Sequence, residues 1–215
     1  MGTEHIEVAL GTPRRLPRPA ALAGRVAVLD IAFASESGGR RNSFERTTLR
    51  FIEGLGERLV AWVDHHDSEH HALFAGDARF LLATKAEHGA CPEMITPELV
   101  TRIGAVDTIV CHNDFDGLAS AAKWIRGGIE PYPGCDDDAR AIDTRIGVAG
   151  ENAQRIDRAL RARGRDAALR KLVVAHLVEG VASEEKWRAI DLVAAELEPL
   201  ERASRELASH YAAVS

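Results

Sequence analysis

Three short apolar runs, each followed at once by polar residues, stand out in the hydrophobic pattern of the chain. They span residues 25–30, 58–63 and 106–111, which is the length of buried strands rather than of ordinary helices. A weaker run at 6–10 lies in a lead-in segment with three prolines and predicts at most one further short strand. The pattern therefore predicts a sheet whose buried strands end in polar loops.

Helical periodicity fills the intervals between these runs and dominates the end of the chain. The helices expected between strands lie at 44–54, with Ser43 as N-cap, at 97–103, and at 118–126 before Gly127 and Gly128. Residues 131–138 contain two prolines and a glycine and break the pattern. Beyond about residue 150 every segment has helical period, with helices expected at 152–163, 166–179 and 184–212.

The last of these helices carries one apolar stripe opposite charged residues, so it is expected to pack against something. The members of the stripe are Trp187, Ile190, Ala194, Leu197, Leu207 and Tyr211. The predicted fold class is α/β: a mostly parallel sheet flanked by helices, with a helical C-terminal region. We divide the chain into a lead-in at 1–24, an α/β core at 25–150, and a helical region at 151–215 that packs on the core or on a partner.

Composition narrows the classes of function. The chain has 215 residues, 46% of them hydrophobic, and a net charge of −6, which argues against a broad basic surface for long nucleic acid. Its three scattered cysteines predict reduced thiols rather than a disulfide framework. No signal-peptide core and no run of about 18 apolar residues is seen, so we expect a cytoplasmic protein that does not engage a membrane.

Two motifs that directly follow predicted strands combine imidazoles with carboxylates. They are Asp64-His65-His66 and His112-x-Asp114-x-Asp116-Gly117. The carboxyl ends of parallel strands share one sheet edge, where α/β proteins bind ligands, and mixed Asp/His sets suit Mn²⁺-like ions. Gly117 is expected to let the chain turn sharply into the next helix, whose N-terminus would favour phosphate. The alternative is a set of solvated loop carboxylates and helix caps.

These motifs resemble those of the DHH phosphoesterase superfamily over residues 25 to about 145. The resemblance implies a parallel α/β domain that hydrolyses phosphoester or phosphoanhydride bonds with two divalent ions, usually Mn²⁺, with Mg²⁺ as the alternative. It also implies roles for single residues: Asp30 bridges the ions, Asp64 and His66 serve catalysis, and His66 faces the scissile phosphate. The implied metal ligands are His112 and Asp114 for one ion, and Asp116 and His65 for the other, with Asp30 between them.

The chain departs from the pattern of that family in three ways. The His112 motif normally comes first but here follows the other two, as in a circular permutation. The fourth motif has only Asp143-Thr144 as a match, so Asp143 is a weaker metal-ligand candidate. The family's C-terminal substrate-binding domain has no counterpart, and the resemblance therefore does not identify the substrate.

Other charged groups carry weaker hypotheses with structural alternatives. His70 and His71 are expected to be exposed loop histidines rather than neighbours of the site, and His176 to lie on a helix face without function. We expect Asp136, Asp137 and Asp138 to form an acidic turn without a ligand. Arg40 and Arg41 could meet a phosphate if their loop closes over the site. The basic residues of the C-terminal region, Arg155, Arg158, Arg161, Arg163, Arg165, Arg170 and Lys171, are expected to be compensated by nearby acids rather than to hold phosphate.

The sequence thus predicts a divalent-metal-dependent phosphoesterase acting on a small phosphorylated molecule or a short oligonucleotide through a water activated by two metal ions. The rival hypothesis is a non-catalytic DHH-like subunit that binds a nucleotide or serves an assembly. Neither hypothesis includes a membrane or an extended nucleic-acid surface, and homo-oligomerisation is left open.

Overall fold

The computed structural model describes residues 6–35 and 43–214. Its strands are β1 (Glu7–Leu10), β2 (Val26–Leu29), β3 (Leu59–Asp64), β4 (Phe80–Leu82) and β5 (Thr108–Cys111). Its α-helices are α1 (Arg50–Leu55), α2 (Pro97–Ile103), α3 (Phe115–Ile125), α4 (Cys135–Thr144), α5 (Glu151–Ala162), α6 (Ala167–Val178), α7 (Glu184–Ala194) and α8 (Glu198–Val214). A π-helix, Phe44–Leu49, precedes α1, and 3-10 turns lie at Pro19–Ala21, Gly56–Arg58, His71–Phe74, Cys91–Met94 and Ala195–Leu197.

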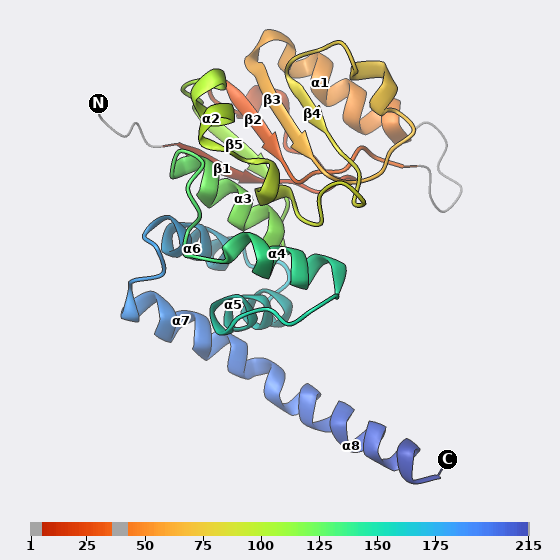
Figure 1. Ribbon diagram of the computed structural model, residues 1–215, viewed down its shortest axis with the longest axis vertical. Helices are drawn as coiled ribbons and strands as arrows, with labels where there is room; N and C mark the ends of the chain where they lie inside the picture. Colours follow the sequence, from red (N-terminus) through yellow and green to blue (C-terminus); the bar gives the residue numbers. More distant parts are fainter. Residues whose placement is uncertain (1–5, 36–42, 215) are drawn as a thin grey trace.

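The strands form one five-stranded sheet in the order β1-β5-β2-β3-β4, and every neighbouring pair is parallel. This confirms the predicted fold class and the shared direction of the three strands identified from the sequence. The pleat sends alternate side chains to opposite faces: Ala27 and Leu29 join one apolar cluster, whereas Val26 and Val28 join the other. Helices cover both faces, as an all-parallel sheet requires (Figure 1).

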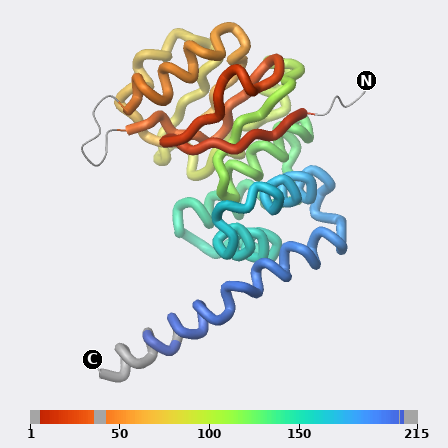
Figure 2. Tube along the Cα trace, turned by 180° about the vertical axis from the view of Figure 1, so that it is seen from behind, coloured from red at the N-terminus to blue at the C-terminus, as the bar shows by residue number. Residues whose placement is uncertain are grey.

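The two faces differ in the helices that cover them. On one face, α1 and the π-helix contribute Phe44 and Phe51 to a cluster around Trp62. On the other, α3 lies against the sheet, and α4, α5, α6 and α7 pack beneath it (Figures 1 and 2). One continuous apolar cluster joins strand residues such as Ala27 to Ile190 of α7. The proposed division of the chain near residue 150 stays a prediction.

Four helix predictions need correction or qualification. Ser43 stands at the N-cap position of the π-helix, as predicted, but it has helical backbone angles and its side chain makes no capping hydrogen bond. Helix α3 begins at Phe115 rather than at Leu118, with Asp114 as its N-cap. Helix α4 was missed, because the pattern break at 131–138 ends at Gly134. The single helix expected at 184–212 is interrupted by a 3-10 turn that separates α7 from α8.

Helix α8 extends away from the rest of the molecule (Figures 1 and 2). The stripe predicted along 184–212 is accordingly buried only in its first part: Trp187 and Ile190 are buried, whereas Leu207 is 58% exposed. The side chain of Tyr211 is not among those described. In the described part of the chain, no helix is both long and apolar enough to cross a membrane.

The topology places a switch point between the neighbouring strands β2 and β5. After β2 the chain leaves for the face covered by α1, while after β5 it enters α3 on the opposite face. Adjacent parallel strands whose connections diverge in this way form the switch point at which open α/β sheets bind ligands. Residue 30 follows β2 and residue 112 follows β5, so both lie at this point.

Candidate metal centre

The carboxyl edge of the sheet gathers the Asp and His residues singled out from the sequence. Asp30 follows β2, and its backbone N–H donates to Val63 O at 2.9 Å. Asp64 ends β3, directly before His65 and His66. Asp30 has a φ of 56°, a left-handed conformation that costs energy for a non-glycine residue. The turn at Asp30 places its carboxylate inside the cluster, and the residue is only 1% exposed.

The two carboxylate oxygens of Asp30 face different imidazole rings. Oδ1 lies 3.3 Å from His65 Nε2 and 3.9 Å from His66 Nδ1. Oδ2 lies 3.9 Å from His112 Nδ1. A carboxylate that presents each oxygen to a separate donor set has the arrangement of a bridging metal ligand.

His65 is held with one ring nitrogen aimed at carboxylates. Its Nδ1 lies 3.0 Å from His88 O, and because a carbonyl can only accept, Nδ1 must carry the proton. Nε2 lies 3.3 Å from both Asp30 Oδ1 and Asp116 Oδ2, yet it makes no hydrogen bond. Metal-bound histidines are commonly oriented by a carbonyl in this way, with the other nitrogen free for the ion.

Asp116 is fixed from outside the cluster. It lies in the first turn of α3 and is 2% exposed. Its carboxylate accepts from the backbone N–H of Cys91, at 3.1 Å for Oδ1 and 3.3 Å for Oδ2. These contacts leave Oδ2 facing His65, so the loop before Cys91 and helix α3 together position this carboxylate.

Two further Asp/His pairs flank the centre. His66 Nδ1 lies 2.8 Å from Asp64 Oδ1, and Asp64 is fully buried. His112 Nδ1 lies 2.7 Å from Asp114 Oδ2. Asp114 Oδ1 accepts from the backbone N–H of Gly117 at 3.1 Å and thereby caps α3. One carboxylate thus serves both the helix and the cluster.

The need for glycine at position 117 has a different cause from the one expected. Gly117 lies inside α3 and does not form the turn. A Cβ at this position would come within 2.5 Å of His112 O and 2.8 Å of His112 Cα. The missing side chain lets the first turn of α3 approach the end of β5, and this brings the His112 loop and Asp116 together.

Among the described residues, the donor atoms fall into three groups, and within each group they lie within 4.8 Å of one another. The groups are Asp30, His65 and His66; Asp30, His112 and Asp114; and His65, Asp116 and Asp143. Three buried atoms in the cluster have no hydrogen-bond partner among the described residues: Asp30 Oδ1, Asp64 Oδ2 and His65 Nε2. Buried polar atoms are normally paired, so this donor set fits divalent cations. Which residues bind metal stays a prediction.

The shifted pKa values of the cluster show that its carboxylates dominate the local electrostatic potential. Burial and the repulsion from Asp116 raise the pKa of Asp30 well above its usual value. Burial also raises the pKa of Asp116 to about 6. Burial alone would lower the pKa of His65, but the attraction of Asp116 and Asp30 outweighs it and raises the value to about 11. Bound protons therefore offset the negative charge that a metal cation would otherwise offset.

The other histidines named from the sequence are less exposed than expected. His70 stacks on Phe44 with ring centroids 3.9 Å apart, and the ring of His71 lies 5.6 Å from Phe33 at a steep angle. Both are partly buried, so the prediction of exposed loop residues is wrong. His176 is on a helix, as expected, but is fully buried and lies edge-on to Trp187.

The acidic run at 136–138 is the first turn of α4 rather than a free turn. Asp136 pairs with Lys123 at 2.5 Å, and Asp138 Oδ2 accepts from the Tyr132 hydroxyl at 2.9 Å. Acidic residues at a helix N-terminus also oppose the helix dipole favourably. These contacts give the acids structural roles. Arg40 and Arg41 lie outside the described residues.

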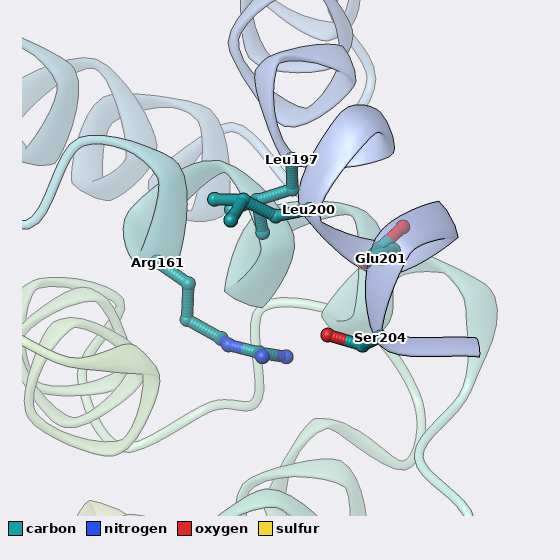
Figure 3. Close-up of a pocket in the computed structure, with 5 residues that line it drawn as sticks. All are labelled: Arg161, Leu197, Leu200, Glu201 and Ser204. Atoms are coloured by element: carbon teal, nitrogen blue, oxygen red, sulfur yellow. The ribbon is translucent and has the colours of Figure 1, made fainter. Parts of the chain in front are cut away.

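Four of the seven basic residues of the C-terminal helices pair with acids, as predicted, and among them Arg161 lies 3.8 Å from Asp157. Arg155 pairs with Asp191 at 2.6 Å and Arg158 with Glu201 at 2.9 Å. Arg163 pairs with Glu196 at 2.5 Å. A pocket where α5 meets α8 is lined by Arg161, Leu197, Leu200, Glu201 and Ser204 (Figure 3). It contains none of the residues of the Asp/His cluster.

Several contacts around the cluster were not foreseen. Lys85 donates to Asp143 at 2.6 Å, and Arg170, only 4% exposed, donates to Asn113 O at 2.7 Å beside the His112 motif. Lys85 follows β4, a three-residue strand that the sequence did not reveal. The apolar triplet at 80–82 was the available signal, whereas nothing in the sequence indicated the Arg170 contact.

No family model, curated protein or solved structure matches this chain. Fold and geometry therefore carry the functional argument. They show a parallel α/β domain with a buried Asp/His cluster that could hold metal ions.

Proposed function

We propose that the protein is a divalent-metal-dependent phosphoesterase of the DHH type, in permuted order, that hydrolyses a small phosphorylated molecule or a short oligonucleotide. The observation that carries this proposal is the position of Asp30. Its two oxygens face His65 and His112 at 3.3 and 3.9 Å, and it belongs to two of the three donor groups. A shared carboxylate between two sets of ligands is what a pair of ions about 4 Å apart requires.

The chain's own residues divide the work in this proposal. His112 and Asp114 would hold one ion with Asp30, and His65 and Asp116 would hold the other, with Asp143 beside them. Two such ions, Mn²⁺ with Mg²⁺ as the alternative, would supply an activated water and offset charge on the phosphate. Asp64 orients His66 through the 2.8 Å contact, so that the other ring nitrogen of His66 can bind or protonate a phosphate oxygen.

The permuted motif order is compatible with this site. All strands are parallel, so the position of each motif at the carboxyl edge depends on strand order in space and not on order along the chain. Asp30, Asp64 and His112 follow or end the neighbouring strands β2, β3 and β5. A circular permutation therefore preserves the site and changes only the order of its motifs along the chain.

One observation favours the rival hypothesis of a non-catalytic nucleotide-binding or assembly subunit. Asp143, a member of the third donor group, is already paired with Lys85. A protein cation at this position could stand in for one ion permanently and leave a single-ion binding site. The number of ions bound separates the two hypotheses.

The test is Mn²⁺ titration of metal-stripped protein, followed by hydrolysis assays on a phosphodiester, a cyclic dinucleotide, pyrophosphate and a short oligonucleotide. We expect two ions per chain and Mn²⁺-stimulated hydrolysis of at least one substrate. Asp137→Asn is the matched control for the site variants, because Asp137 is an exposed acid on α4. Ion binding without any turnover would favour the hypothesis of a non-catalytic binding subunit over that of an enzyme. The absence of ion binding would contradict both hypotheses.

A further inference from the structure

Lys85 occupies an unusual place at the sheet edge. It comes three residues after the end of β4, and its ammonium donates to Asp143 Oδ2 at 2.6 Å across 58 residues of sequence. Asp143 lies with His65 and Asp116 in one donor group. The side chain of Lys85 is 39% exposed, so the ammonium stands between the buried carboxylates and solvent.

The charges around Lys85 extend beyond this one ion pair. Burial would lower the pKa of Lys85, but the hydrogen bond to Asp143 and the attraction of Asp116 and Asp30 raise it. The ammonium is therefore bound by Asp143 and attracted by Asp116, and both carboxylates belong to the group expected to hold the second ion. A divalent cation in that donor group and an ammonium on Asp143 repel each other at short range.

We propose that Lys85 is the phosphate-binding residue of this site, stored on Asp143 in the metal-free protein and released toward the substrate phosphate when an ion takes Asp143. The proposal rests on the proposed function, because it presumes an ion in the group of His65, Asp116 and Asp143. A flexible lysine stem lets the ammonium move from the carboxylate to a phosphate oxygen nearby. The ammonium of Lys85 then neutralises negative charge on the substrate phosphate instead of on Asp143.

Metal affinity provides the first test. K85Q removes the competing charge, K85R keeps it, and K186Q removes a comparable ion pair, that of Lys186 with Glu179 at 2.7 Å, away from the cluster. Isothermal titration of metal-stripped protein with MnCl₂ is expected to show the second ion binding on the order of tenfold more tightly to K85Q than to wild type. K85R and K186Q are expected to match wild type.

Phosphate affinity provides the second test. With both ion positions saturated by Mn²⁺, inorganic phosphate is expected to bind K85Q on the order of tenfold more weakly than wild type. K85R and K186Q are expected to retain binding. Opposite effects of one substitution on metal and phosphate are not expected if Lys85 merely supports the fold.

The outcomes separate this inference from the function on which it rests. If wild type and K85Q bind two Mn²⁺ ions equally well, or if K85Q binds phosphate like wild type, the role of Lys85 is wrong while the two-ion site stands. If neither protein binds a second ion, the two-ion site is wrong and the role of Lys85 falls with it. A second ion that binds only to K85Q supports competition in its strongest form.

Discussion

The molecule contains two regions rich in charged residues, and the structure satisfies their charges in different ways. At the sheet edge, buried acids and imidazoles face one another with unpaired atoms, including Asp30 Oδ1 and His65 Nε2. In the helical C-terminal region, several arginines form ion pairs with acids, as Arg155 does with Asp191 and Arg158 with Glu201. From the sequence, the sheet edge is predicted to bind metal ions and phosphate, whereas the basic helical region is the weaker candidate for a phosphate site.

The difference lies in what the fold leaves unsatisfied. An exposed arginine beside an exposed carboxylate is at low energy already and gains little from a ligand. A buried carboxylate with like-charged neighbours is at high energy until a cation arrives. Unpaired buried charge therefore points to a ligand, whereas abundant but paired charge points to solvation and packing.

The largest contrast is expected for activity. Asp114→Asn and Asp116→Asn should each lower Mn²⁺-dependent hydrolysis at least about a hundredfold, because loss of a charged ligand weakens stabilisation of the transition state by several kcal/mol. Asparagine keeps the cap on Gly117 and the acceptor for Cys91 N–H. Initial rates and thermal melts would be measured together. The same change at Asp191, in the helical region, should leave the rate unaltered, and an equal loss there would break the comparison.

Substitution of Asp30 is expected to increase stability in the metal-free protein, whereas the site substitutions above decrease activity. Asp30→Asn is expected to raise the unfolding free energy of the metal-free protein at pH 7 by about 2 kcal/mol, since it replaces a carboxylate whose charged form is disfavoured by burial and by repulsion from Asp116. Asparagine also tolerates the left-handed backbone. Melting with and without MnCl₂ measures this.

In saturating Mn²⁺ the order should reverse. Wild type gains about 2.7 kcal/mol when free metal reaches a hundred times Kd, while the variant gains little. A metal-free variant less stable than wild type would show that the charge of Asp30 is already compensated.

The strand ends could be predicted from sequence because buried parallel strands are continuous apolar runs. Asp30 and the motifs at Asp64 and His112 follow such runs directly, so their convergence follows once the strands share a sheet and a direction. Strand β4 could not be predicted in the same way, since it is three half-buried residues at an edge. Helix α4 was concealed by its polar first turn after Gly134, although acids at a helix start were a usable signal.

The contacts that orient the site were beyond sequence reasoning for a physical reason. The carbonyl of His88 and the N–H of Cys91 act through backbone atoms, which every residue carries. Lys85 and Asp143 meet only because the fold brings residues 58 positions apart to one edge. Side-chain identity alone therefore located the donors of the cluster but not the groups that hold them.

A smaller effect is expected at His176, the exception within the helical region. Its ring is buried with both nitrogens unpaired, and burial lowers its pKa, with Lys186 and Arg155 adding to the effect and Glu179 and Glu184 opposing it. The folded state then binds fewer protons than the unfolded state. Stability therefore falls as pH drops through about 6.5, the ordinary histidine value.

His176→Leu should remove this component. Urea unfolding at pH 7.5 and 5.5 is expected to show wild type losing about 1 kcal/mol more than the variant. Titration elsewhere is common to both proteins and cancels in the difference. Parallel losses in the two proteins would mean that His176 stays accessible to protons in the fold.

The smallest effect should come from the paired charges themselves. A double-mutant cycle of Arg158→Gln and Glu201→Gln is expected to give a coupling of less than about 1 kcal/mol, because both groups are partly exposed and screened by water. The coupling should shrink further in high salt, whereas the affinity for Mn²⁺ at the sheet edge should not change. A coupling that survives high salt would mean that the pair fixes the start of α8 against α5. A change in Mn²⁺ affinity would mean that the two charged regions are linked through the fold, against the separation that their contacts imply.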